Sequence, residues 1–274
     1  MNIMFCGDSH AEDGILIATL SLLKNTSAPL HLYILTMQAE GYEAFNDQAF
    51  NLIKKIIKEK DPNNTAELID CTELFKKEPP RANMETRFTP YAMLRLFADQ
   101  ILQIPNRILY LDDDIIVRKD ISDFYNQDLT NVELVGVLDF WGRFFFHNIH
   151  SHKTFDYLNS GVLLLNMDEI KKTRLFAKVR GKMSDKKMLL PDQSALNKLA
   201  TEKRIAPRCY NEQYRLHPDT KIQHFTTSFR FNPYFHTLTV KPWDVERVHS
   251  VLKLHEYDDL LKQYTELKPL LKQH

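Results

Sequence analysis

Strand and helix patterns alternate through the first half of this 274-residue chain. Short apolar runs at residues 2–6, 30–35 and 67–69 have the length and composition of buried strands. Helical patterns at residues 13–23 and 42–57 lie between them. This order predicts an α/β fold with a mostly parallel sheet and helices on both faces, because parallel neighbours need a crossover connection. Ligands of such sheets bind beyond the carboxyl ends of the strands, so functional residues are expected there.

One later strand pattern leads directly into three consecutive carboxylates. An apolar run that begins at Arg107 reaches Asp112, Asp113 and Asp114, and a second apolar run follows. In an extended chain, Asp112 and Asp114 would project to one side and Asp113 to the other. Two neighbouring carboxylates repel each other unless a cation lies between them, and oxygen ligands suit Mg²⁺ or Mn²⁺. The pattern predicts a metal site for a phosphorylated ligand, and a polar strand-to-loop transition is the alternative.

Composition argues against several classes of protein. The chain has 36 basic residues (Lys and Arg) and 36 acidic residues (Asp and Glu), so it has no net positive charge that would favour nucleic acid as a partner. Cys6, Cys71 and Cys209 form neither a metal-ligand pattern nor a disulfide framework, which favours a reducing, cytoplasmic location. No apolar run is long enough for an integral membrane segment. The chain also lacks a GxGxxG or P-loop pattern, so a nucleotide would be held by side chains and a metal.

The second half of the chain has a less regular pattern, without a linker or a shift in composition. Residues Pro191-Asp192-Gln193 open a helical pattern, and Asp192 is expected to be its N-cap. The other elements expected from periodicity are a helix at 91–102, a strand at 162–165, a helix at 168–183, a strand at 222–225, and helices at 244–254 and 257–271.

Four motifs follow one another along the chain: Tyr110-Leu111-Asp112-Asp113-Asp114, Asn159-Ser160-Gly161-Val162-Leu163-Leu164-Leu165-Asn166, Asp192-Gln193, and His224 followed by Lys241-Pro242-Trp243. With these motifs the chain resembles the bacterial branch of glycosyltransferase family 8, a retaining group that includes lipopolysaccharide galactosyl- and glucosyltransferases and glycogenin. The resemblance implies a GT-A fold, which is Rossmann-like. Residues 1–243 would form the catalytic domain, and residues 244–274 a helical extension packed on it.

The resemblance also implies which residues bind the donor, expected to be UDP-glucose or UDP-galactose. Asp112, Asp114 and His224 would bind Mn²⁺ or Mg²⁺, and the imidazole favours Mn²⁺. Lys241 would contact the pyrophosphate. Around the uracil and ribose the resemblance implies Cys6, Asp8 and His10. At the donor sugar it implies Asp139, Asn159 and Ser160, with Arg95 at the sugar or phosphate and Asp113 as a further substrate contact. The implied catalytic residues are Asp192 and Gln193.

The sequence departs from the family pattern near the expected uracil site. Many relatives carry Asn and a stacking aromatic residue where this chain has His10 and Ala11, and Arg87 stands where relatives often have His. The acceptor is not specified by these motifs and could be a saccharide, a glycolipid or a glycoprotein. For retention of configuration, same-face attack by the acceptor is preferred to a covalent intermediate, because no carboxylate is placed as in retaining glycosidases.

Other kinds of protein use similar carboxylate patterns. A phosphatase of the haloacid dehalogenase type would need Gly-Thr just after the carboxylates, where this chain has Ile115-Ile116. A Ca²⁺-binding loop would need a central Gly and a distal Glu. The main alternative is therefore a non-catalytic protein that binds a nucleotide sugar.

Two further segments carry predictions of their own. Sixteen residues separate His224 from Lys241, a longer spacing than in simpler relatives, and the insertion 225–240 is rich in aromatic residues. It is expected to be an active-site lid that helps to select the acceptor, with permanent packing in the core or in an oligomer as the alternative. Residues 244–274 mix acidic and basic side chains, which predicts packing on the enzyme rather than binding to a membrane surface.

Overall fold

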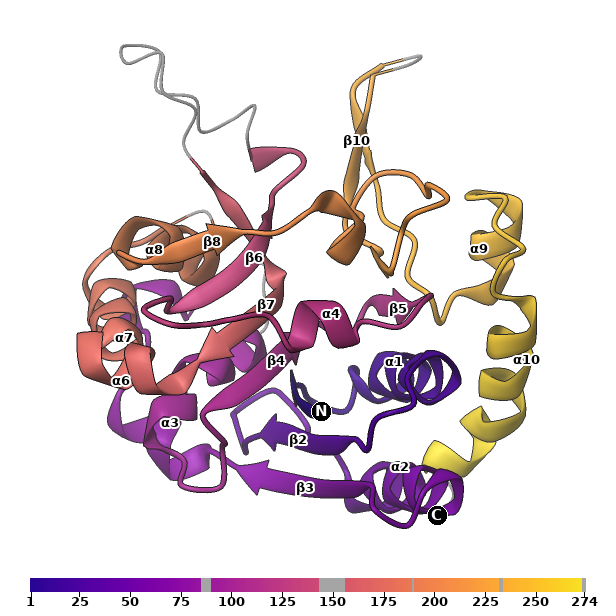
Figure 1. The fold of residues 1–274 in the computed structure, drawn as a ribbon, viewed down its shortest axis with the longest axis horizontal. Helices are drawn as coiled ribbons and strands as arrows, with labels where there is room; N and C mark the ends of the chain where they lie inside the picture. The colour runs from indigo at the N-terminus through magenta and orange to yellow at the C-terminus, as the bar shows by residue number, and fades with distance from the viewer. Residues whose placement is uncertain (85–89, 143–155, 189, 232–233, 273–274) are drawn as a thin grey trace.

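A seven-stranded sheet lies at the centre of the structure, a computed structural model that describes residues 1–84, 90–142, 156–188, 190–231 and 234–272 (Figure 1). The strands, in the order in which they pair, are β3 (Thr65–Asp70), β2 (His31–Thr36), β1 (Asn2–Cys6), β4 (Arg107–Leu111), β7 (Leu158–Asn166), β6 (Leu134–Leu138) and β8 (Lys203–Ile205). Only β7 runs against its neighbours β4 and β6, and the other pairs are parallel. The predicted α/β fold with a mostly parallel sheet is confirmed.

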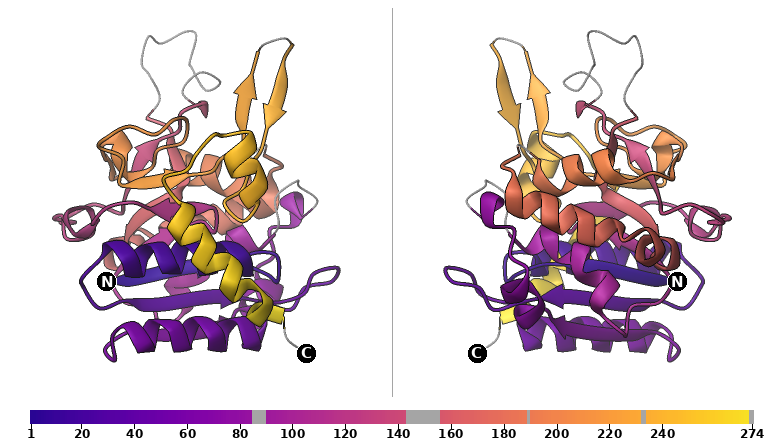
Figure 2. Two further views of the ribbon diagram at one scale, coloured as in Figure 1. Left: turned by 90° about the vertical axis from the view of Figure 1, so that its right-hand side faces the viewer. Right: turned by 90° about the vertical axis from the view of Figure 1, so that its left-hand side faces the viewer.

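Helices cover both faces of this sheet. Successive side chains of β1 point to opposite faces, so Ile3 and Phe5 join one buried cluster and Met4 and Cys6 the other. The first cluster is covered by α1 (Glu12–Asn25), α2 (Asp47–Lys60) and α10 (Asp258–Leu267) (Figure 2). The second is covered by α3 (Thr72–Lys77), η2 (Pro90–Gln100), α6 (Met167–Thr173), α7 (Leu175–Asp185) and α8 (Pro191–Leu199).

The helix α2 shows how local sequence produces these elements. Its apolar residues Ala49, Ile53 and Ile57 recur at intervals of four, form one buried stripe, and face the sheet. The side chain of Asn46 caps the amino end, where its Oδ1 accepts a 2.8 Å hydrogen bond from the Ala49 N–H. The helix runs from Asp47 to Lys60 rather than over the expected residues 42–57, and it ends before Asp61, which precedes a proline that disfavours a helical conformation there.

Some predictions from periodicity were wrong. The charged helix expected at 168–183 is two helices, because Arg174 adopts a left-handed conformation, with φ of 58°, between α6 and α7. The segment expected to be an α-helix at 91–102 is the 3-10 helix η2, which aligns residues three apart. Asp192 is not an N-cap: Leu190 holds that position, Pro191 begins α8, and the Asp192 carboxylate pairs with Arg95 instead.

The carboxylate triplet is a turn rather than part of a continuous extended strand. It joins β4 to a short strand β5 (Ile115–Val117), which pairs antiparallel with β9 (Ile222–His224) outside the central sheet. In this pairing Ile115 lies opposite His224, so the distal histidine motif comes to the end of the triplet. The alternation of faces expected for an extended chain therefore does not apply to these three residues.

One edge of the sheet gathers the sequence motifs. Because β1, β4 and β6 run in the same direction, Asp8, Asp112 and Asp139 follow their carboxyl ends at a single edge. The reversed strand β7 begins at this edge, which brings Asn159 and its neighbours to the same place. The antiparallel direction of β7 was not predicted, and it explains how a motif at the start of a strand meets motifs at the ends of others.

The C-terminal segment packs on the body of the protein. Leu260, Leu261, Tyr264 and Leu271 are buried in the cluster formed with α1 and α2, and the Tyr264 hydroxyl donates a 2.7 Å hydrogen bond to Asp13. Whether residues 244–274 form a separate unit stays a prediction. In the described part of the chain no helix has the length and apolar character needed to cross a membrane. The remaining elements are η1 (Arg81–Asn83), α4 (Ser122–Tyr125), η3 (Arg208–Tyr210), β10 (Ser228–Arg230), β11 (His236–Leu238), α9 (Val245–Ser250) and η4 (Lys268–Lys272).

Candidate active site

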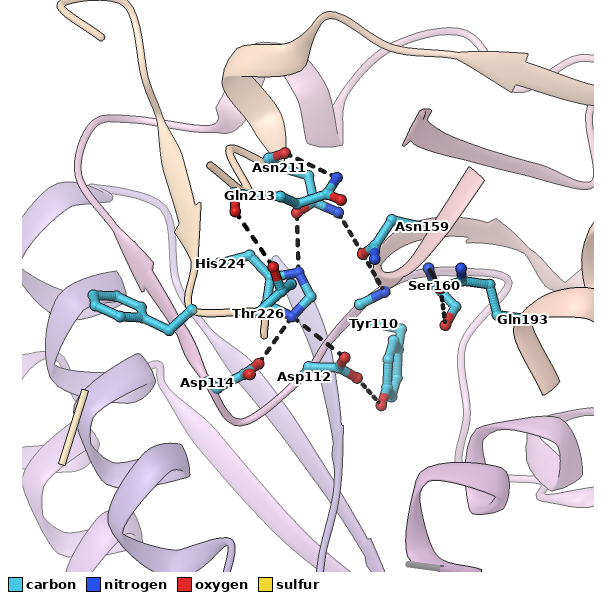
Figure 3. Close-up of polar contacts among 12 residues, drawn as sticks. Tyr110, Asp112, Asp114, Asn159, Ser160, Gln193, Asn211, Gln213, His224 and Thr226 are labelled. Carbon is cyan, nitrogen blue, oxygen red and sulfur yellow. Dashed lines mark hydrogen bonds and ion pairs between the residues drawn. The ribbon is translucent and has the colours of Figure 1, made fainter. Parts of the chain in front are cut away.

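Asp112, Asp114 and His224 form a cluster at this edge of the sheet (Figure 3). One carboxylate oxygen from each aspartate and one imidazole nitrogen lie within 4.8 Å of one another. The Nε2 atom of His224 is 2.9 Å from Asp114 Oδ1 and 3.6 Å from Asp112 Oδ2. Two oxygen ligands and one nitrogen ligand that converge in this way can hold a divalent transition-metal cation such as Mn²⁺.

Asn211 fixes the orientation of His224. The Nδ1 atom of His224 is 3.0 Å from the amide oxygen of Asn211, and this oxygen can only accept, so Nδ1 carries the proton. The other nitrogen, Nε2, faces the two carboxylates and would bind a metal there once it has lost its proton. The Asn211 amide nitrogen donates a 2.9 Å bond to Asn159 Oδ1, which links the histidine to the Asn159 motif. Nothing in the spacing of the motifs pointed to Asn211.

Gly161 leaves the space that this cluster occupies. A methyl group at its Cα would lie 2.2 Å from His224 Cε1 and 2.6 Å from Asp112 Oδ2. Contacts this short are sterically forbidden, so only glycine lets β7 approach the histidine and the aspartate. The glycine of the Asn-Ser-Gly motif is therefore required by close packing behind the cluster rather than by its backbone conformation.

Lys241 lies beside the cluster and forms an ion pair with Asp114. Its ammonium group also donates a 3.3 Å hydrogen bond to the Phe225 carbonyl. Burial opposes the charge of Lys241, but Asp114 outweighs this effect and raises the pKa of the lysine. Burial would likewise raise the pKa of Asp114, yet Lys241 and His224 hold that pKa below its usual range. The lysine is therefore a charged group at the metal-ligand cluster.

Asp113 differs from the two flanking aspartates. Its own burial, together with repulsion by the Asp114 carboxylate, raises the pKa of Asp113 to about 8. Its backbone carbonyl lies against α1, where a methyl group on Gly14 would come within 2.3 Å of it. Asp113 thus lies apart from the converging ligand atoms of its neighbours, and its expected contact with substrate stays a prediction.

Arg95 lies beneath the cluster and is only 2% exposed. Its guanidinium pairs with Asp192, is 3.3 Å from Asp112 Oδ1, and donates a 2.9 Å hydrogen bond to the Ser160 carbonyl. It also stacks 4.3 Å from the ring centre of Tyr110, whose hydroxyl donates a 2.6 Å bond to Asp112. Arg95 therefore holds Asp112, a candidate metal ligand, and Asp192, an expected catalytic residue, in place. A direct contact of Arg95 with the donor stays a prediction.

Gln193 connects the remaining predicted sugar-binding residues. Its amide oxygen accepts 3.0 Å and 3.2 Å hydrogen bonds from the backbone N–H and hydroxyl of Ser160. Its amide nitrogen donates a 3.0 Å bond to Asp139 Oδ2, which also accepts a 3.0 Å bond from Asn159. With Asp192 these residues form one buried polar network next to the cluster. The structure thus brings together all the residues that were expected to contact the sugar.

Asp8, His10 and Cys6 lie at and just beyond the end of β1. Asp8 is buried, and its Oδ1 accepts a 3.0 Å hydrogen bond from the His10 N–H. Its Oδ2 is also buried and accepts no hydrogen bond from the described residues, so it can receive one from a ligand. The His10 side chain is largely exposed, whereas burial raises the pKa of the Cys6 thiol well above its usual range. Arg87 lies outside the described residues.

The insertion 225–240 forms a projecting hairpin of β10 and β11 (Figure 1). Phe229 and Phe235 stack with ring centres 5.8 Å apart, and Phe235 lies 5.5 Å from Phe231. Phe229 also packs edge to face on Trp141, two residues beyond Asp139 in the sugar-binding network. A row of aromatic rings therefore extends from this network along one face of the hairpin.

Comparison with known proteins identifies the family. The model of the glycosyl transferase family 8 matches residues 2–246. The lipopolysaccharide 1,2-glucosyltransferase of Escherichia coli K12 is 24% identical over 237 residues, which cover 81% of this chain and 64% of that protein. A relative in Haemophilus influenzae is 26% identical over 211 residues, which cover 72% of this chain and 58% of the relative. The chain therefore spans less than two thirds of the length of either relative.

Solved structures share the fold at low sequence identity. The galactosyltransferase LgtC, in complex with donor and acceptor sugar analogues, has a TM-score of 0.68 at 16% identity, over 98% of this chain and 100% of that chain. The glycosyltransferase GlyE of Streptococcus pneumoniae TIGR4 has a TM-score of 0.62 at 20% identity, over 97% of this chain and 64% of that chain. The expected GT-A fold is confirmed. On the strength of the family match, this chain belongs to glycosyl transferase family 8.

Proposed function

We propose that this protein is a metal-dependent retaining glycosyltransferase that moves glucose or galactose from a UDP-sugar to a saccharide, glycolipid or glycoprotein acceptor. The observation that carries the proposal is the convergence of Asp112, Asp114 and His224, with Lys241 beside them. The E. coli relative is named as a glucosyltransferase and LgtC as a galactosyltransferase, which supports a hexose as the transferred sugar. Three free cysteines fit a reducing, cytoplasmic location.

The leaving diphosphate would be stabilised from two directions. A divalent cation held by Asp112, Asp114 and His224 would neutralise negative charge on the diphosphate as the bond to the sugar breaks. Lys241 would exchange its ion pair with Asp114 for contact with a phosphate oxygen. Asp8 would accept a hydrogen bond from the uracil N–H through its buried Oδ2. These groups would hold UDP at the edge where β1 and β4 end.

The sugar would be held by the network around Gln193. Asp139 and Asn159 would bind its hydroxyl groups, and Asp192, paired with Arg95, would lie near the reacting carbon. The bond from the sugar carbon to the diphosphate oxygen breaks, and a bond to the acceptor oxygen forms on the same face. The acceptor proton passes to the departing phosphate oxygen, which balances the reaction without an enzyme nucleophile. Same-face attack is preferred because Arg95 engages the Asp192 carboxylate, and Ser160 and Asp139 engage the Gln193 amide.

The β10–β11 hairpin would contribute to acceptor binding. The rings of Phe229, Phe231 and Phe235 form one row, and Phe231 and Phe235 are 69% and 58% exposed. Exposed aromatic faces suit the apolar faces of sugar rings, and a projecting hairpin beside a site can close over substrate. This arrangement supports the lid hypothesis more than permanent core packing of these side chains.

Release of UDP from UDP-glucose or UDP-galactose, with Mn²⁺ and no added acceptor, tests the proposal. We expect slow release that stops in EDTA and returns when Mn²⁺ is added. An acceptor array with the preferred donor then identifies the acceptor class. A protein that binds UDP-sugars with Mn²⁺ but never releases UDP would instead support the alternative, a non-catalytic nucleotide-sugar-binding protein.

A further inference from the structure

A pocket of about 250 Å³ lies on the opposite side of the hairpin from the aromatic row. Side chains of paired strands alternate between faces, so Phe229 belongs to one face of the hairpin and Ser228, Arg230 and Leu238 to the other. The second face lines the pocket together with residues of the 213–216 segment. The hairpin therefore separates the aromatic row from a second concave surface.

Two arginines in this pocket have no acidic partner in the described part of the chain. Arg215 and Arg230 both line it, and neither forms an ion pair with any residue in the described ranges. The Nε of Arg230 is buried and has no hydrogen-bond partner among the described residues, which is costly unless a ligand provides one. None of the described residues that line the pocket is acidic. The neighbouring carboxylate of Glu212 pairs with Arg208 and does not neutralise this charge.

The rest of the pocket is part apolar and part polar. Leu216, Leu238, Val240 and Leu252 contribute aliphatic surface, and Gln213, Gln223, Thr226 and Ser228 contribute polar groups. Two guanidinium charges suit the double negative charge of a phosphate better than the single charge of a carboxylate. A molecule that fills this space would therefore carry a phosphate next to an apolar part.

We propose that this pocket binds a phosphate-bearing amphipathic molecule and that Arg215 and Arg230 hold its phosphate. His224 lines the pocket and also belongs to the metal-ligand cluster, so the occupant lies next to the site of sugar transfer. Resting on the proposed function, we assign this occupant to the phosphate-bearing part of the acceptor, while the aromatic row on the other face of the hairpin would bind its sugar part. The acceptor class is then a phosphate-bearing lipid or lipid-linked glycan rather than a neutral sugar.

Calorimetric titration with hexyl phosphate in EDTA tests the pocket without donor or metal. We expect Arg230→Gln and Arg215→Gln each to weaken binding at least tenfold, and Arg230→Lys to weaken it less. Arg247→Gln is the matched control, because Arg247 lies on α9 and pairs with Asp244 at 3.5 Å. Loss of binding in Lys241→Gln, with normal binding in Arg230→Gln, would place the probe in the donor site and overturn the proposal. Thermal melts show whether each variant is folded.

Three related probes separate the parts of the proposal. Hexyl glucoside should bind at least tenfold more weakly than hexyl phosphate, because it lacks the charge. Inorganic phosphate should also bind more weakly, because it lacks the apolar part. Equal affinity for either probe contradicts an amphipathic phosphate site. Hexanoate that binds as tightly as hexyl phosphate would show that any anion suffices, which contradicts the selection of phosphate.

The assignment to the acceptor has its own test. Hexyl phosphate at saturation should lower kcat for UDP release into water severalfold without changing KM for the UDP-sugar, because it excludes water beside His224. The decrease should be absent in Arg230→Gln. An unchanged kcat would remove the acceptor assignment, and a raised KM alone would indicate competition with the donor. A wild-type protein that binds hexyl phosphate but never releases UDP would refute the proposed function and leave the pocket standing.

Discussion

Replacement of Asn211 by leucine tests how the metal-ligand histidine is oriented. Asn211 is 1% exposed and accepts the hydrogen bond from His224 Nδ1 while it donates one to Asn159. Leucine has nearly the same size but can neither accept nor donate. In Asn211→Leu the imidazole loses the partner that directs Nε2 toward Asp112 and Asp114. The Mn²⁺ site should therefore weaken although all three ligands remain.

The expected size of this effect follows from the contacts that are lost. Removing a hydrogen-bond partner of a metal-bound histidine weakens metal affinity about 10- to 100-fold, or about 1.4–2.8 kcal/mol. The amide of Asn159 also loses a buried partner, which should cost about 1–3 kcal/mol of folding stability. Asn211→Asp keeps an acceptor for His224 Nδ1 and loses only the bond to Asn159. This variant should thus bind Mn²⁺ much more tightly than Asn211→Leu.

Calorimetric titration with Mn²⁺ measures this effect without any assumption about catalysis, and thermal melts in EDTA measure stability separately. The concentration of Mn²⁺ that gives half-maximal UDP release should rise by the same factor as the dissociation constant. A folded Asn211→Leu variant with wild-type affinity for Mn²⁺ would refute this reasoning. Equal weakening in Asn211→Asp and Asn211→Leu would show that the bond to Asn159, rather than the bond to His224, controls the site.

Four further predictions follow from the site and the surface. Asp114→Asn should abolish UDP release while the protein stays folded, and Asp113→Asn should reduce UDP release far less. Full activity of Asp114→Asn would exclude Asp114 as a metal ligand. Gly161→Ala should lower Mn²⁺ affinity by more than tenfold, measured by calorimetry, because its methyl group would overlap the ligands. A short Gly-Ser linker in place of residues 229–236 should preserve UDP binding and donor hydrolysis but reduce transfer to acceptor, and normal transfer would contradict the lid. The purified protein should not sediment with anionic liposomes at physiological salt, because residues 244–274 lack a continuous cationic face. Strong sedimentation would contradict the packing of residues 244–274 on the enzyme.

Local sequence determined the order of elements and much of the chemistry. The stripe of Ala49, Ile53 and Ile57 predicted α2, and the alternation of such stripes with short apolar runs predicted a parallel sheet. These predictions succeed because helices and strands bury apolar side chains at fixed intervals along the chain. The four motifs also predicted which residues gather at one edge, since the ends of parallel strands meet there.

Long-range pairing decided what the motifs could not show. The reversed direction of β7, the pairing of β5 with β9, and the resulting contact of Asn211 with His224 join segments far apart in the sequence. The family resemblance assigned Arg95 to the donor, and the fold buries it against Asp112 and Asp192. Periodicity records which face of an element is buried but not which partner covers it. The candidate metal ligands were therefore readable in the sequence, whereas the groups that orient them, and the arginine pocket behind the hairpin, were set by tertiary packing.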